Sequence, residues 1–62
     1  MRKLFYKVNH VNERFREITV FSGGLLLCEL ECLSNHLTNE EEIQQWLDDN
    51  GYGDEEFDFE KI

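Results

Sequence analysis

The feature that most constrains this chain is the turn sequence Ser22-Gly23-Gly24, which separates two short apolar segments. The segment before it, residues 15–21, contains Ile18-Thr19-Val20, and β-branched side chains favour extended structure. Two consecutive glycines suit the left-handed backbone of a two-residue hairpin loop. The sequence therefore predicts that residues 15–21 and 25–33 form two antiparallel strands.

Residues 25–33 have an alternative interpretation. Leu26, Leu30 and Leu33 have the spacing of one helix face. However, residues 28–32 read Cys-Glu-Leu-Glu-Cys, which alternates strictly, and the glycines before them favour a hairpin return. We predict a third strand here, and a helix stays open as the alternative.

Two more segments alternate between apolar and polar side chains. Residues 2–9 place Leu4, Tyr6 and Val8 on one side, which predicts a first strand. Residues 56–62 alternate phenylalanine with acids. They predict a short fourth strand, or a tail that becomes a strand on binding.

Residues 38–50 carry the clearest helix signal. Thr38 and Glu41 have the spacing of a capping box, in which each side chain bonds the backbone N–H of the other residue. Ile43, Trp46 and Leu47 then form an apolar stripe at helical spacing. Gly51 follows, and a glycine at this place commonly ends a helix.

The element order is therefore β-β-β-α-β, and a length of 62 residues leaves room for a single domain over residues 1–62. This order predicts an α+β fold: a small antiparallel sheet of three to four strands, with one α-helix packed on one face. Apolar side chains such as Phe5 and Tyr6 fall on opposite faces of the sheet. Because one helix covers only one face, we expect a homodimer, with a different partner protein as the alternative.

The charge of the chain is acidic and unevenly distributed. The net charge is -8, with five bases and one acid in residues 1–16 against one base and thirteen acids in residues 17–62. Such a field repels phosphate, so we expect no direct nucleic-acid binding. The longest uninterrupted apolar run is residues 25–28, far below the roughly 18 residues of a membrane span, so we expect no membrane insertion.

The acids concentrate between residues 48 and 60, with aromatic side chains among them. Asp48 and Asp49 fall in the last helical turn, where the helix dipole disfavours negative charge. Residues placed against local stability are candidates for function, and the alternative is an acidic surface that only aids solubility. We predict a surface that binds a basic protein, made of Asp48, Asp49, Tyr52, Asp54, Glu55, Glu56, Asp58 and Glu60.

The two cysteines, Cys28 and Cys32, are four residues apart. On a strand their Cα atoms would be about 13 Å apart, too far for a disulfide, so we expect free thiols and a cytoplasmic protein. With His36 they form only a weak zinc pattern, because one stretched cysteine pair lacks the tight spacing of zinc knuckles. We therefore expect no zinc site.

Calcium binding and catalysis are also weakly indicated. Residues 48–59 partly match a calcium-binding EF-hand loop, but Tyr52 and Phe59 stand at two of the ligand positions. The sequence contains no nucleophile elbow, phosphate loop or dinucleotide fingerprint. We expect no cofactor, no metal and no enzymatic activity.

In size and charge the chain is similar to small acidic proteins that mimic DNA and inhibit nucleic-acid enzymes, a similarity of composition that carries over no residue. We expect a protein–protein interaction module that docks its acidic surface on the basic, nucleic-acid-binding surface of another protein, as an inhibitor or regulator. The alternative is a structural or assembly subunit that self-associates and has no catalytic activity.

Overall fold

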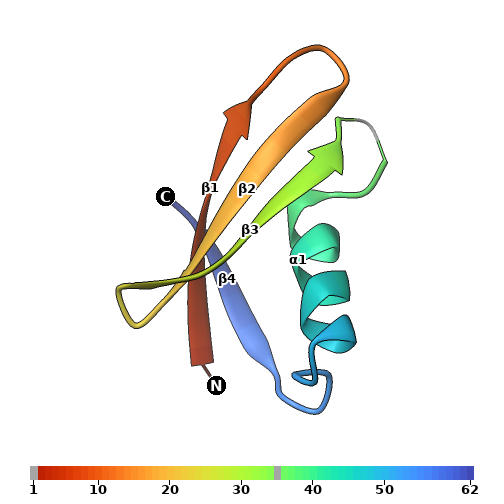
Figure 1. Cartoon of the computed structure of the whole chain (residues 1–62). Coiled ribbons are helices and arrows are strands. Elements are labelled where there is room, and N and C mark those ends of the chain that lie inside the picture. The colour runs from red at the N-terminus through yellow and green to blue at the C-terminus, as the bar shows by residue number, and fades with distance from the viewer. Residues whose placement is uncertain (1, 35) are drawn as a thin grey trace.

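The predicted hairpin is present in the computed structural model, which describes residues 2–34 and 36–62 (Figure 1). It joins β2 (Phe15–Ser22) to β3 (Leu25–Leu33). Gly23 and Gly24 have φ angles of 59° and 81°, the left-handed values that a two-residue hairpin loop of this kind requires. Residues 25–33 are thus a strand, and the helical alternative is wrong.

The sheet has four strands in the order β3-β2-β1-β4, where β1 is Arg2–His10 and β4 is Phe57–Lys61. β1 pairs with β2 and β2 pairs with β3 in antiparallel fashion, as predicted. β4 instead runs parallel to β1, so the sheet is mixed and mostly antiparallel. The C-terminal segment is docked, and the backbone N–H of Ile62 extends the pairing by donating to the Tyr6 carbonyl oxygen at 2.7 Å.

The helix α1 (Asn39–Asp49) lies within the predicted residues 38–50, and both of its ends follow the sequence signals. The Thr38 hydroxyl accepts from the Glu41 N–H at 3.2 Å, and the Glu41 carboxylate accepts from the Thr38 N–H at 3.0 Å. At the other end Gly51 has φ 87°, and the Tyr52 N–H bonds back to the Leu47 carbonyl at 2.9 Å. The capping box and the glycine stop are confirmed.

The helix packs on one side of the sheet, here called the helix face; the opposite side is called the open face. Ile43 and Leu47 of α1 are fully buried against the side chains that the strands direct toward them. The expected arrangement of one helix on one face is confirmed, and the α+β class with it. The core consists of Leu4, Tyr6, Ile18, Val20, Cys32, Ile43 and Leu47.

A buried arginine fastens the start of α1 to the sheet. Arg16 is only 5% exposed, and its guanidinium donates to the Asn39 side chain at 2.8 Å and to the carbonyl oxygens of Leu33 and Leu37. The Glu42 carboxylate lies 3.9 Å away. Arg16 therefore supplies hydrogen-bond donors to the backbone carbonyl oxygens between β3 and α1, and its guanidinium is not available to a ligand.

Within the described residues, no helix has the length and apolar character that crossing a lipid bilayer requires.

Candidate functional site

The structure places the predicted partner-binding residues in two groups. Asp48 and Asp49 end α1, and the loop that follows carries Tyr52 and the acids up to Glu56, so these residues gather at one end of the molecule. Asp58 and Glu60 lie on the open face instead, because β4 places them opposite Lys3 and Phe5. We call the first group the acidic end: Asp48, Asp49, Asp54, Glu55 and Glu56.

The loop of the acidic end is held against the helix. Tyr52 stacks on Trp46 with ring centroids 6.1 Å apart and an angle of 18° between the rings. A Cβ on Gly53 would come within 3.3 Å of the Asp48 carboxylate, so the loop backbone passes close to the helix at this point. The Tyr52 carbonyl oxygen accepts from the Glu55 N–H at 3.1 Å. The acids of this end are therefore carried on an ordered loop.

Three basic side chains are already paired within the molecule. Arg2 lies 3.7 Å from Glu55, and Lys3 lies 3.3 Å from Glu60. Arg2 also lies over the Phe57 ring, 5.8 Å from its centroid. With the Arg16 contact to Glu42, these pairs show that bases of β1 and β2 neutralise acids of the same chain.

The remaining acids of this end keep their charge uncompensated. Asp49, Asp54 and Glu56 are exposed, and none has a basic group of the described residues within 4.0 Å. Asp48 only accepts a hydrogen bond from the Gln44 amide, at 3.0 Å. The acidic end thus presents net negative charge to solvent.

A second acidic feature, which the sequence reasoning missed, is a groove between β3 and α1. It is an open hollow of about 310 Å³. The alternation of residues 28–32 indicates a strand, but only the packing of α1 places the edge of β3 beside the helix. Leu30 and Cys32 lie on the helix face of this edge, and Glu29 and Glu31 lie at its rim on the open face. We call this hollow the β3–α1 groove, and it is lined by Glu29, Leu30, Glu31, Cys32, Glu42, Gln45, Trp46 and Asp49.

The two cysteines are free thiols on β3. Burial raises the pKa of Cys28 to about 11, and burial together with a hydrogen bond to Glu42 raises the pKa of Cys32 to about 11. Such thiols are poor nucleophiles and poor metal ligands near neutral pH. Within residues 2–34 and 36–62, no three His, Cys, Asp or Glu side chains are grouped to hold a metal ion.

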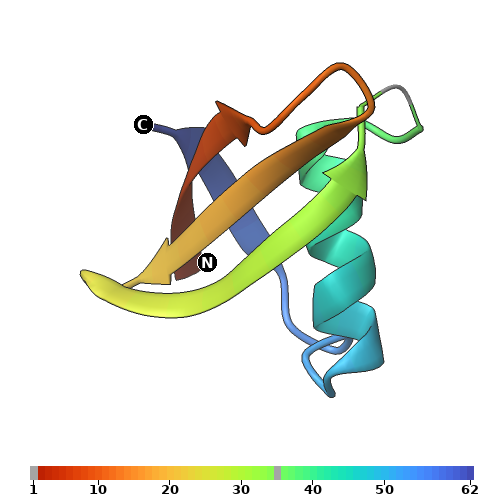
Figure 2. The ribbon, with the colours of Figure 1, turned by 45° about the horizontal axis from the view of Figure 1, so that its top comes forward.

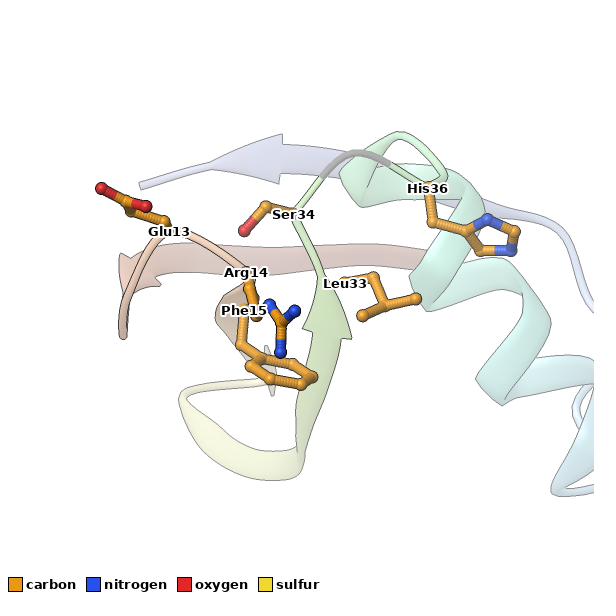
Figure 3. Close-up of a pocket in the computed structure, with 6 residues that line it drawn as sticks. All are labelled: Glu13, Arg14, Phe15, Leu33, Ser34 and His36. Carbon is orange, nitrogen blue, oxygen red and sulfur yellow. The ribbon is translucent and has the colours of Figure 1, made fainter.

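Another open hollow, of about 510 Å³, is at the far end of the sheet from the acidic end and has both acidic and basic side chains around it (Figure 3). It lies between the β1–β2 turn and the end of β3. Ser34 and His36 point to different sides of the chain there, so they do not form a nucleophile–base pair (Figure 3). The side chains around it are Glu13, Arg14, Phe15, Leu33, Ser34 and His36.

No protein-family model, curated protein or solved structure matches the chain.

Proposed function

We propose that this chain is a small acidic interaction module that docks on a basic surface of another protein. The observation that carries the proposal is the charge left over after internal pairing. Arg2, Lys3 and Arg16 are used within the molecule, whereas Asp49 and Asp54 of the acidic end face solvent without a basic neighbour among the described residues. An uncompensated field of one sign steers a partner of the opposite sign and raises its association rate.

The proposed role is that of an inhibitor or regulator. A basic protein surface that holds nucleic acid is spaced for phosphates, and carboxylates on an ordered loop present a similar row of negative charges. Tyr52 and Trp46, stacked beside the acids and half-buried, would add aromatic contact area at the centre of the interface. The free thiols on β3 agree with a reducing compartment, and we place the protein in the cytoplasm.

The test is a salt-gradient elution of captured partners from the immobilised protein. The variant Asp54→Asn plus Glu56→Gln removes two charges from the acidic end without touching the core. We expect it to release a basic partner at lower salt than the wild type, since screening and charge removal weaken the same interaction. The control, Glu13→Gln plus Glu40→Gln, makes the same change in net charge at exposed residues outside the acidic end and should elute like the wild type.

Equal elution of the two variants would contradict a docking role for the acidic end. If the partner is a nucleic-acid-binding protein, the inhibitor role further requires that adding this protein displaces the nucleic acid. A partner that holds both at once would contradict inhibition.

Self-association is the second candidate, and the open face favours it. Phe5, Phe21 and Leu26 lie side by side across three strands, and Ile62 is 69% exposed next to them. A second copy is the occupant we propose, because this face also carries the bases and acids of β1 and β4 and can complement itself. Sedimentation velocity would show a dimer that Phe21→Lys dissociates; a wild-type monomer at all concentrations would contradict it.

A further inference from the structure

The feature that carries a further inference is the outer edge of β3. β3 is nine residues long and pairs only with β2, so its other side presents unpaired backbone N–H and C=O groups among the described residues. The opposite edge strand, β4, has five residues. Long open edges are templates for another strand. The pairing of β3 with β2 shifts register at Leu27, so the regular part of this edge is residues 28–33.

The helix α1 offers a surface on which one face of such a strand could pack. Both views show α1 beside the β3 edge (Figures 1 and 2). The β3–α1 groove lies between them, so a strand added to β3 would direct every second side chain toward Trp46 and its neighbours on α1. The other side chains would lie next to Glu29 and Glu31 on the open face. One face of the added strand would therefore contact α1, and the other face would lie beside acidic side chains.

The acidic residues around the β3–α1 groove favour a basic strand at the β3 edge. Asp49 borders the groove on the helix side, and Glu29 and Glu31 border it on the open face, while no lysine or arginine lines it. Glu42 also lines it, but its carboxylate is already paired with Arg16. Glu31 also lies directly opposite Glu17 on β2, a like-charge pair that destabilises the sheet. A basic segment beside Glu31 would relieve this repulsion.

The same charges argue against pairing with a second copy. If β3 met β3 of another copy in antiparallel fashion with the pair centred on Leu30, Glu29 of each copy would lie directly opposite Glu31 of the other. Like charges directly opposite are destabilising, and charged side chains on an edge strand are a known device against self-pairing. These charges therefore disfavour the centred pairing with a second copy and favour a basic strand.

We propose that the β3 edge binds an extended basic segment of a partner protein as a fifth strand of the sheet. Backbone hydrogen bonds along β3 would hold the segment in place. Lysine or arginine side chains at alternate positions would pair with Glu29 and Glu31, and smaller apolar side chains between them would enter the β3–α1 groove beside Trp46. This inference rests on the proposed function, because it names the segment of the basic partner and the place where it binds.

The experiment uses a capped peptide as long as β3, in which arginine alternates with valine, and the intact protein. Trp46 is the only tryptophan of the chain, so its fluorescence reports binding in the groove. Hydrogen exchange reports protection of the β3 amides that point away from β2. The control peptide has the same sequence with N-methyl groups on alternate residues, which keeps its charge and blocks hydrogen bonds along one edge.

We expect the unmethylated peptide to shift the Trp46 emission and to slow exchange along β3, and the methylated peptide to bind at least about tenfold more weakly. The variant Glu29→Gln plus Glu31→Gln should weaken binding by a similar factor. Asp54→Asn plus Glu56→Gln, with the same change in net charge outside the groove, should leave it nearly unchanged.

Equal binding of the two peptides, without protection of β3, would overturn strand addition while leaving the docking role of the acidic end intact. A larger loss from Asp54→Asn plus Glu56→Gln than from the β3 variant would do the same. Failure of both peptides to bind would overturn the inference, and the elution experiment would still decide the proposed function on its own.

Discussion

The two faces of the sheet are made from the same alternating strands, yet their burial differs sharply. On the helix face, Leu4, Ile18 and Val20 are 0% exposed because α1 covers them. On the open face, Phe5 and Phe21 are only half-buried, although they are larger. Alternation in a strand therefore places side chains on a face, whereas their burial depends on what covers that face.

The largest effect is expected on the helix face. Ile43→Ala removes a fully buried side chain from the centre of the core and leaves a cavity, which should lower the free energy of unfolding by about 2–5 kcal/mol. Urea unfolding monitored by Trp46 fluorescence measures it. Gln45→Ala, on the exposed side of the same helix, is the control and should change stability by less than about 0.5 kcal/mol. Similar losses for both would mean that α1 does not cover the core.

The next effect concerns the buried cation on that face. Arg16→Met fills the space but leaves the carbonyl oxygens of Leu33 and Leu37 without their guanidinium donor. We expect a loss of about 3 kcal/mol, since hydrogen bonds to buried charged groups are strong and their loss leaves acceptors unsatisfied. Arg14→Met changes an exposed arginine two residues away and should be nearly neutral. If the two variants unfolded at the same urea concentration, the fastening role of Arg16 would be wrong.

The helix face also protects its thiols. Burial raises the pKa of Cys28 and of Cys32 from 9.0 to about 11, so each folded thiol stays protonated where an unfolded one begins to ionise. At pH 8 alkylation should be about 100-fold slower in the folded protein than in urea, as judged from thiolate fraction alone. Mass spectrometry of each cysteine follows the rates.

These raised pKa values predict that the folded protein becomes less stable at high pH. A thiol whose folded pKa lies above its unfolded pKa contributes its full stabilisation below pH 9, and this is lost as the pH rises toward 11. We therefore expect the urea midpoint to fall over this range. In Cys28→Ala plus Cys32→Ala the fall should be smaller, and an unchanged fall would show that other groups cause it.

A smaller effect is expected on the open face. Phe21→Ala removes a half-buried ring, so the cost should be about 1 kcal/mol in the monomer. A cost that grows with protein concentration would instead show that a second copy covers this face. Chemical unfolding at two concentrations separates the two outcomes.

The smallest effect is expected at the acidic end. Asp49→Lys places a favourable charge at the negative end of the α1 dipole and should stabilise the fold by about 0.3–1 kcal/mol, while weakening binding to a basic partner. Asp54→Lys makes the same charge change outside the helix and should affect binding without the dipole contribution. If Asp49→Lys stabilised the protein and left partner binding intact, Asp49 would have no part in docking.

Local sequence signals predicted the elements well because each signal acts within a few residues. The glycine pair requires a tight turn, Thr38 and Glu41 cap each other over one helical turn, and Gly51 ends the helix at the next residues. The acidic end was predicted for the same reason, since Asp48 to Glu56 are close along the chain. Asp58 and Glu60 were grouped with it by sequence distance, but strand alternation moves them to the open face.

The features that the sequence does not predict involve residues far apart along the chain. β4 runs parallel to β1 because the chain crosses the sheet through α1 and re-enters at the opposite edge, a path that no local pattern encodes. Arg16 is one of the five bases of residues 1–16, and only the approach of Leu33, Leu37 and Asn39 buries it. The β3–α1 groove likewise exists only where the helix meets the strand edge. The sequence alone predicts the elements and the sign of the surface charge, because both depend on side chains and their neighbours along the chain. Packing decides which charges are paired within the molecule and which face solvent.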